Sequence, residues 1–430
     1  MKKKTEDTLW FTNVVNDIEH QQRINQVLDI NDYLLRKHKV LLRPDTQFKD
    51  EVFNSAKIVI NTIRSIIDMH VSYVIGNPVS ISGDDSIENV YNKVYKKGGY
   101  NKTDFEITSD LYKYGNAFEY VHLDGNRITS KVINNADAYP VYGEKYNYTH
   151  FIEHWRDISG NAFYIVYYPD RVEEYKNSEL VNEQINLTGL PIHYAAIDRS
   201  EYSHFGDGLM LDLIPIMDAI EYLLSYMDDS VIRLSLNPIG VAKGRRVDEK
   251  IPKDMVGAVL NMEDGDGDFK WASNELDYNS VKVLLEHLIQ NFYATAGIPS
   301  SVFGQSNISN VSETSLKFLF AETDNKARKT IHSLKEGMFK RFDYMRKLLQ
   351  LNDITFTDDI YDTLDINFNI NRPVDTESLI EGLKTQRDMG AISIKTIIEK
   401  SPYTVDVSEE IKRIEAENNN NNNSEDIENE

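Results

Sequence analysis

An acidic stretch at residues 263–275, EDGDGDFKWASNE, carries the residue types and spacing closest to a known chemical motif. Its carboxylates stand at positions 1, 3, 5 and 12 of a calcium-binding loop, namely Asp264, Asp266, Asp268 and Glu275. Such a loop needs glycine at position 6 for its sharp turn, where this chain has Phe269, and the preceding GAVLNM favours a strand over a helix. The pattern therefore favours an Asp-Gly hairpin turn over a calcium site, and whether that turn binds a cation stays open.

The remaining chemical patterns are weaker. The adjacent acids Asp228-Asp229 and Asp358-Asp359 could hold a hard metal ion as in nucleases, but neighbours on a helix point to different faces. The histidines are scattered without an H-E-x-x-H pattern, and no nucleotide-binding loop is present. The sequence therefore predicts no catalytic residue, no metal, no cofactor and no enzyme, with a metal-dependent nuclease or hydrolase as the alternative.

The chain is strongly acidic, with a formal net charge of −22 over 430 residues. A DNA-binding protein ordinarily neutralises phosphates with lysine and arginine, so this chain either never meets nucleic acid or meets it without gripping it. Cysteine is absent, which suits a reducing cytoplasm. Neither a secretory signal nor a stretch apolar enough to span a membrane is expected. The length predicts about three compact units.

The first half of the chain is expected to form one α+β domain of about 200 residues. An apolar face recurs every three or four residues from Val52 to Val74, which predicts a long helix ended by Gly76 and Pro78. Further along, the patterns predict a helix, a hairpin and a meander of tyrosine-rich strands, at Asp104 to Tyr114, Ala117 to Ile133 and Tyr139 to Tyr194.

The second half is predicted to be mostly helical. Apolar periodicity predicts helices at Leu209–Leu234, Ser280–Ala296, Leu316–Leu349, Thr376–Met389 and Ile394–Lys400. Strands are expected in a small insert at 235–273 and again, as strand–turn–strand, in ITFTDDIYDTLDINFNI at 354–370. The asparagine-rich, acidic end at 418–430 is expected to be disordered.

Several motifs, taken in order, resemble one family. They are SYVIGNPVSIS at 72–82, SDLYKYGNAFEYVHLDG at 109–125, LIPIMDAIEYLLSYMDDSVIRL at 213–234 and IQNFYATAGIPSSVFGQSNISNVSETSLKF at 289–318. Their order and spacing resemble the portal proteins of tailed double-stranded-DNA bacteriophages, in the long-tailed-phage branch. The resemblance extends over about residues 15 to 417.

The resemblance implies an α+β portal fold that assembles into a ring. The implied parts are an N-terminal wing at 1–205, stem helices at 206–234 and 274–296, a clip at 235–273, a tunnel loop and long helix at 297–349, wing return strands at 350–375, C-terminal wing or crown helices at 376–417 and the disordered tail at 418–430.

The resemblance also implies a function and partners. The protein would form a dodecameric ring at one capsid vertex of the virion, assembled in the host cytoplasm, with a channel for genome packaging and ejection. Double-stranded DNA would pass without sequence-specific binding. The implied protein partners are the terminase large subunit, the head-tail adaptor, and the major capsid and scaffolding proteins, and no membrane is involved. Another head-tail connector or scaffold component is the alternative within the same assembly.

The connection between the second stem helix and the tunnel helix is the expected DNA-facing loop. Gly297-Ile298-Pro299 ends one helix, and Asn310 with Glu313 forms the capping-box pattern of the next. Little charge lies between them, which suits a mobile loop that touches DNA through weak polar contacts. The expected DNA-facing residues are Gln305, Ser306, Asn307, Ile308, Ser309, Asn310 and Val311.

Charge suggests roles for three further sets. An acidic channel wall would repel phosphates and keep DNA centred, and its candidates are Asp212, Asp218, Glu221, Asp228 and Asp229. The tunnel helix has a basic face that is either solvated, in contact with phosphates, or paired with a neighbouring subunit's acids, through Lys317, Lys326, Arg328 and Lys329. The expected partner surface of the clip comprises Arg245, Arg246, Lys250 and Lys253.

Overall fold

The structure is a computed structural model, and the chain divides into two compact units. It describes residues 9–48, 51–143, 147–198, 203–231, 239–243, 268–272, 278–300, 313–372, 376–404 and 407–425. Unit 1 comprises Met1–Ser300 and Thr323–Asn371, and unit 2 comprises Ser301–Glu322 and Arg372–Glu430. We describe each unit by itself. The mixture of helices with antiparallel sheets agrees with the α+β class expected from the sequence.

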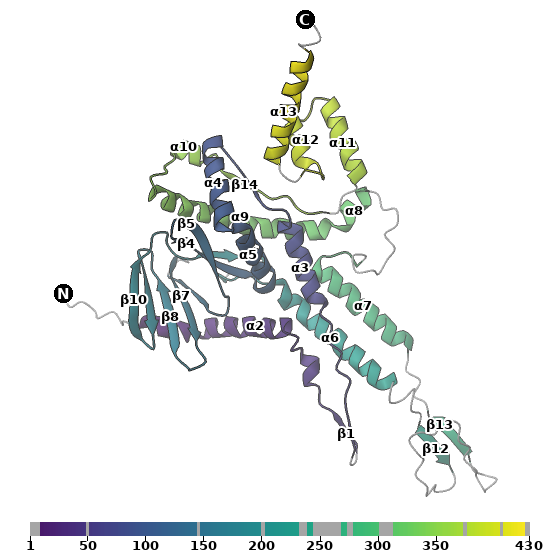
Figure 1. The fold of residues 1–430 in the computed structure, drawn as a ribbon. Helices are drawn as coiled ribbons and strands as arrows, with labels where there is room; N and C mark the ends of the chain where they lie inside the picture. The colour runs from purple at the N-terminus through teal and green to yellow at the C-terminus, as the bar shows by residue number, and fades with distance from the viewer. Residues whose placement is uncertain are drawn as a thin grey trace. The chain divides into compact units, whose positions relative to one another are not determined.

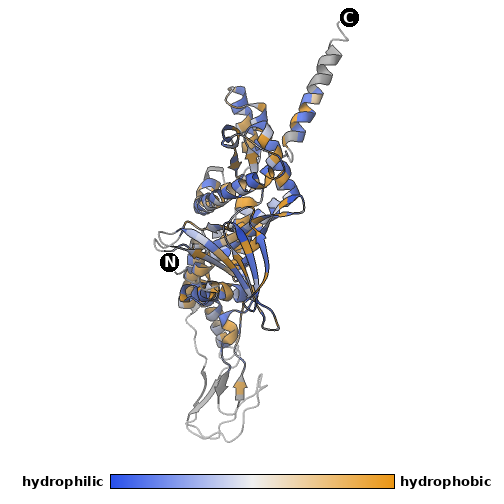
Figure 2. Ribbon diagram, turned by 90° about the vertical axis from the view of Figure 1, so that its left-hand side faces the viewer, coloured by the Kyte–Doolittle hydropathy of each residue, from blue (hydrophilic) through white to orange (hydrophobic). Residues whose placement is uncertain are grey.

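A five-stranded antiparallel sheet in unit 1 accounts for the tyrosine-rich meander predicted from the sequence (Figure 1). Its order is β10-β9-β8-β7-β6, with β6 at Ala138–Tyr142, β7 at Tyr148–Arg156, β8 at Ala162–Tyr167, β9 at Arg171–Lys176 and β10 at Glu179–Ile185. Hydrophobic and hydrophilic residues lie side by side along its strands (Figure 2), as expected for strands with one buried face.

Two N-terminal helices cover the buried face of this sheet. They are α1 at Trp10–Val15 and α2 at Ile18–Leu34, and the Asp17 carboxylate caps α2 by accepting from the Ile18 N–H. Phe11, Val15 and Ile24 pack with Tyr139 and other residues of the sheet in one buried cluster. The second half of α2 extends beyond this cluster toward the helical part of unit 1 (Figure 1).

A second, three-stranded sheet has the order β11-β4-β5. The predicted hairpin is confirmed: β4 at Asn116–Asp124 and β5 at Arg127–Ile133 pair across Gly125, whose φ is +61°. Strand β11, Ile192–Ala195, pairs with β4 on its other side. Helix α5, Tyr100–Tyr114, contains the predicted helix at 104–114. Helix α4, at Asp85–Gly98, was not predicted.

The predicted helix from Val52 to Val74 is only half correct. Helix α3 spans Thr62–Ile75, whereas Glu51–Phe53 form strand β2, which pairs with β1 at Thr46–Phe48. Residues 54–61, which lie between β2 and α3, have no regular secondary structure. The backbone N–H groups of Ala56, Ile58 and Ile60 bond to side chains of another helix instead of to carbonyls of their own turn.

The long helices of the second half lie near their expected positions. Helix α6, Leu209–Ser230, and helix α7, Tyr278–Ala296, pack side by side (Figure 1). The expected helix from 316 to 349 is interrupted at Phe320, which separates α8, Glu313–Leu319, from α9, Ala321–Gln350. This break lies next to the boundary between the two units.

The expected strand–turn–strand at 354–370 is corrected in its first half. Residues 358–361 form the helical turn α10, because Asp358 and Asp359 in its first turn suit a helix N-terminus and Asp358 pairs with Arg346 at 2.7 Å. The second strand is present as β14, Asp365–Asn367, which pairs with β3, Ser80–Ser82.

Strands β12, Ile239–Lys243, and β13, Asp268–Ala272, form an antiparallel pair within the insert. Asp268 of the calcium-like stretch therefore begins a strand, while Asp264, Asp266 and Glu275 lie outside the described residues. The predicted clip residues Arg245, Arg246, Lys250 and Lys253 also lie outside them.

Unit 2 contains α8 and the C-terminal helices. Helices α11, Thr376–Asp388, and α12, Ile394–Lys400, match the two predicted helices. Helix α13 spans Val407–Glu425, so residues 418–425 are helical where the sequence predicted disorder. A helix that has nucleated adds one hydrogen bond per residue, and α13 starts with acids in its first turn and an Arg413–Glu409 pair.

Candidate functional site

Residues 54–60, which have no regular secondary structure, lie along one face of α6 and bind its polar side chains. The N–H groups of Ala56, Ile58 and Ile60 donate at 3.1, 3.0 and 2.7 Å to Asp229 Oδ1, Ser225 Oγ and Glu221 Oε1. Two extended residues rise about 6.6 Å and four helical residues about 6 Å, so every second N–H meets every fourth side chain of the helix. This match of spacings explains why the segment is extended although its apolar residues have helical periodicity.

The carboxylate of Glu221 is fully buried in this contact. The Nδ1 atom of His38 lies 2.7 Å from Glu221 Oε1, and neither side chain is exposed. The His38 ring stacks on Tyr33 with 3.7 Å between ring centroids. Burial raises the pKa of Glu221, while the hydrogen bonds from the Ile60 N–H and from His38 oppose that rise. The pair holds the segment after α2 against the middle of α6.

Two more predicted channel acids are engaged within the same subunit. Arg43 pairs with Asp229 at 2.7 Å and stacks over the Tyr226 ring, with 3.8 Å from its guanidinium carbon to the ring centroid. Lys39 pairs with Asp218 at 3.0 Å, and the Asp218 side chain is only 11% exposed. Carboxylates that are buried and paired inside one subunit contribute little to the field of a channel, which acts through exposed charge.

The five predicted channel acids therefore fall into two groups. Asp218, Glu221 and Asp229 bind the residue 38–60 region of their own subunit. Asp212 is exposed and Asp228 is half-buried. We keep only Asp212 and Asp228 as candidates for a channel wall.

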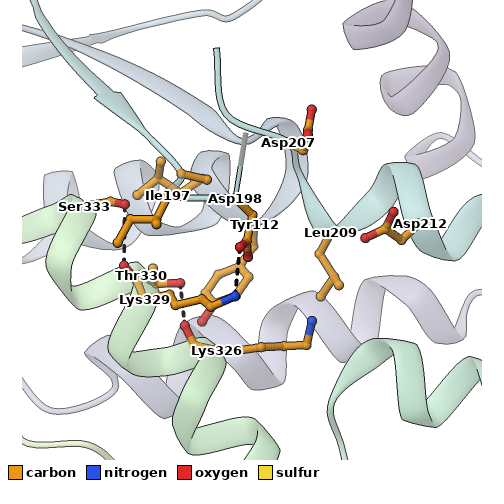
Figure 3. A pocket seen from close by; sticks show the side chains of 12 residues that line it. Tyr112, Ile197, Asp198, Asp207, Leu209, Asp212, Lys326, Lys329, Thr330 and Ser333 are labelled. Carbon is orange, nitrogen blue, oxygen red and sulfur yellow. Dashed lines mark hydrogen bonds and ion pairs between the residues drawn. The ribbon is translucent and has the colours of Figure 1, made fainter. Parts of the chain in front are cut away.

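Acids near the start of α6 and bases of α9 surround a small cavity of about 90 Å³. Lys329 Nζ lies 2.8 Å from Asp198 Oδ1, and the Lys326 side chain extends toward α6 on the side of Asp212 (Figure 3). Burial, then the charges of Asp212 and Asp198, raise the pKa of Asp207 in the same lining. Lys329 thus pairs with an acid of its own subunit. Its neighbour Arg328 is also exposed.

The two ends of the expected DNA-facing connection meet at α3. The carbonyl of Ala296, at the end of α7, lies 2.8 Å from His70 Nε2, and Gly297 has a φ of +69°. The Thr323 hydroxyl donates to the Gly297 carbonyl at 2.6 Å. The next residue, Asp324, accepts from the Tyr73 hydroxyl at 2.6 Å. The chain therefore leaves unit 1 and returns to it at one anchored point.

The His70 anchor depends on a neutral imidazole. Burial lowers the pKa of His70 to about 4, the Ala296 carbonyl opposes this change, and Lys326 adds to it. In the neutral ring Nε2 carries the proton that it donates to Ala296, and Nδ1 is buried without a partner. Protonation of Nδ1 would leave a buried charge and donor unsatisfied.

We expect acid to weaken unit 1 through this histidine. Between pH 6.5 and about 4, His70 binds a proton in the unfolded chain but stays neutral in the folded chain. The free energy of unfolding therefore falls as pH falls through this window. The largest loss is about 3 kcal/mol. Urea denaturation followed by tryptophan fluorescence measures it, because Trp10, Trp155 and Trp271 all lie in unit 1. His70→Gln keeps the N–H donor, and its stability relative to wild type should rise as pH falls; a pH-independent difference would contradict this.

Helix α9 is held against α5 and β4 by a fully buried arginine. Arg341 donates to Asp104 Oδ1 at 2.5 Å, to Glu119 Oε2 at 3.0 Å and to the Tyr95 hydroxyl at 2.9 Å. The Tyr194 hydroxyl donates to the same Glu119 oxygen at 2.5 Å. Burial raises the pKa of Asp104 to about 6, against the opposing effect of Arg341. This network joins α4, α5, β4, β11 and α9.

Several predicted site residues cannot be placed. The DNA-facing residues Gln305, Ser306, Asn307, Ile308, Ser309, Asn310 and Val311 lie outside the described residues. Lys317 is exposed on α8 in unit 2. Among the described residues, no group of three or more histidines and acids is placed to hold a metal ion, and no helix is long and apolar enough to cross a membrane.

Sequence reasoning missed the anchors of this region. In the sequence, His70 was a lone histidine, Thr323 a residue inside the expected helix from 316 to 349, and Arg341 one base among many. Their partners lie 226, 26 and 222 residues away in the chain, so no local spacing identifies them. The one available signal was Arg341 on an otherwise apolar face of α9, next to the buried Phe342.

Comparisons with known proteins agree with this fold. Residues 17–424 match the family described as "Phage portal protein, SPP1 Gp6-like". A chain in the structure titled "Neck of empty GTA particle computed with C6 symmetry" is similar with a TM-score of 0.50 at 8% identity, over 78% of this chain and 87% of that chain. Chains in "Virion of native gene transfer agent (GTA) particle" and "Neck of native GTA particle computed with C12 symmetry" are similar over the same shares at 8% identity and a TM-score of 0.47. No curated protein matches.

The chain belongs to the phage portal protein family. That family is structural, so the protein has a portal or connector role and is not an enzyme.

Proposed function

We propose that the protein forms a ring, with dodecameric symmetry, at one vertex of a phage-like capsid. The ring encloses a channel through which double-stranded DNA is packaged and later ejected. The terminase large subunit docks on the ring during packaging, the head-tail adaptor binds afterwards, and the major capsid and scaffolding proteins surround it. The ring assembles in the host cytoplasm. The match of residues 17–424 to the portal family carries this proposal.

We also propose the domain roles of a portal subunit for the parts of this chain. We assign residues 1–205 and 350–375 to the wing, 206–234 and 274–296 to the stem, 235–273 to the clip, 297–349 to the tunnel loop and helix, and 376–417 to C-terminal wing or crown helices. The packing of α6 against α7 supports a paired stem. The network around Arg341 supports a rigid union of the tunnel helix with the wing.

The anchored connection supports a DNA-facing loop. Its ends are joined through the Thr323–Gly297 bond at 2.6 Å and are fixed to α3, so the connection begins and ends at one rigid point. Such a base lets a loop touch passing DNA without moving the stem. Asp212 and Asp228 supply negative charge along α6 that would keep phosphates at a distance. Lys317, Lys326 and Arg328 would either face phosphates or remain solvated.

Imaging of the purified protein tests the proposal. We expect negative-stain electron microscopy to show rings with a central hole, and native mass to give twelve subunits or a neighbouring number. A protein that stays monomeric under all assembly conditions would contradict the proposed ring.

Removing the loop separates transport from assembly. We expect deletion of Gln305 to Ser309 to leave ring formation unchanged, because the anchors at Ala296, Gly297 and Thr323 remain. DNA packaged per capsid should fall at least tenfold in a packaging assay with terminase. The matched control removes the same number of residues from the acidic tail, Asp426 to Glu430. Loss of rings in the loop variant would instead make this loop a structural joint.

A further inference from the structure

The edge strand β10 exposes aliphatic and acidic side chains along its whole length. Every residue from Glu179 to Ile185 is exposed, and Leu180, Val181 and Ile185 are 53%, 66% and 78% exposed. Among the described strands it pairs with β9 alone, so within this part of the chain its other edge carries unpaired backbone groups. We call Glu179, Leu180, Val181, Glu183 and Ile185 the acidic edge.

The acidic edge also carries an electrostatic conflict that a cation would relieve. Glu183 lies directly opposite Glu173 in the register of β10 and β9. Like charges at such a position are destabilising. Glu173 forms an ion pair with Arg171 at 2.6 Å, whereas Glu179 and Glu183 form none with the described residues. A partner for this edge should therefore bring both apolar groups and positive charge.

A surface of the complementary kind follows α2. Leu35 and Leu42 are 68% and 84% exposed, and Leu41 is 40% exposed. Arg36 and Lys37 lie exposed between them. Lys37 pairs only with the exposed Asp32, and exposed pairs of this kind contribute little, so Lys37 can exchange partners. We call Leu35, Arg36, Lys37, Leu41 and Leu42 the basic patch.

The two surfaces cannot meet within one subunit. The basic patch follows the end of α2, a helix of 17 residues and thus about 26 Å long, whose first half packs on the sheet. Strand β10 is the edge farthest from β6, across four strand spacings of about 4.8 Å. Figure 1 shows β10 and the end of α2 on opposite sides of the sheet region.

We propose that the acidic edge of one subunit docks on the basic patch of a second copy of this chain. Two different, complementary surfaces on one molecule give a head-to-tail contact, and such contacts close into rings when the rotation allows. Aliphatic groups meet aliphatic groups, and Glu179 and Glu183 meet Arg36 and Lys37. This inference rests on the proposed ring and specifies one contact between its neighbours.

Charge reversal on each surface provides the test. An edge variant carries Glu179→Lys with Glu183→Lys, and a patch variant carries Arg36→Glu with Lys37→Glu. Each variant alone places like charges at every contact, so we expect its self-association to be at least tenfold weaker in analytical ultracentrifugation. An equimolar mixture alternates the two chains and restores opposite charges at every contact. The mixture should therefore form rings of wild-type size.

The mixture is its own control, because each chain keeps its substitutions and any folding defect would persist. Circular dichroism of the separate variants checks that they are folded. Rings from either variant alone at wild-type concentration, or a folded mixture that stays unassembled, would overturn the proposed contact. Absence of rings from the wild-type chain would instead refute the ring itself, so the two failures are distinguishable.

Discussion

Replacing Arg341 with methionine should destabilise unit 1 by about 3–5 kcal/mol. The side chain is fully buried, and its guanidinium bonds to Asp104 at 2.5 Å and Glu119 at 3.0 Å. Methionine fills much of the volume but leaves two buried carboxylates without their cation. The measurement is urea denaturation followed by tryptophan fluorescence, which reports unit 1.

A neighbouring base gives the control for this variant. Lys340 is half-exposed and pairs with the exposed Glu336 at 3.0 Å, so Lys340→Met should change stability by less than about 0.5 kcal/mol. Adding Asp104→Asn and Glu119→Gln to Arg341→Met should recover part of the loss, because the unpaired charges are then removed. Equal effects of Arg341→Met and Lys340→Met would show that the buried network does not hold α9.

The use of acids in α6 changes how the negative charge of this protein is understood. Composition alone suggests a wall of carboxylates along α6, yet Glu221 and Asp229 accept hydrogen bonds from backbone N–H groups within residues 54–60. These carboxylates serve as acceptors for N–H groups that have no helical carbonyl partner. Part of the acidic charge of α6 therefore holds residues 54–60 against the helix, and a smaller part is exposed to solvent.

Much of the fold could be predicted from local sequence. The β4–β5 hairpin follows from alternation around Asp-Gly, and α6, α7, α11 and α12 follow from apolar periodicity. Helix α4 was missed although its signals are present: Asp84 caps it and Gly99 ends it with a φ of +74°. Its apolar stripe is narrow, with Ile87, Tyr91 and Tyr95 as the buried residues, so periodicity alone gave a weak signal.

The errors arise where distant side chains override local preference. The apolar residues of the segment 54–61 have helical periodicity. Its alternate backbone N–H groups donate to Asp229, Ser225 and Glu221 instead, and these bonds keep the segment out of the helix. These partners lie 161 to 173 residues away in the chain. The same limit applies to the candidate site: charge and periodicity identify the acids of α6, while their buried partners are visible only in three dimensions.

The junction between α5 and the segment before α6 should tolerate no side chain at Gly115. Gly115 ends α5 with a φ of +73°, and its position would put a Cβ only 2.2 Å from the carbonyl oxygen of Gly206, just before α6. Asn116 fixes that approach, because its side chain both donates to the Gly206 carbonyl and accepts from the Gly206 N–H at 3.0 Å. An added methyl group would push the start of α6 away from the end of α5.

Gly99 isolates this close approach from backbone strain. It ends α4 with a φ of +74°, as Gly115 ends α5, but a Cβ there would meet nothing within 4 Å. Gly99→Ala should therefore cost about 1 kcal/mol from its left-handed backbone alone. Gly115→Ala should cost about 2–4 kcal/mol, since overpacking adds to the same strain. Equal losses in urea denaturation would mean that the segment before α6 moves away from Gly115 without an energetic cost, and the contact would then not fix the start of α6 rigidly on α5.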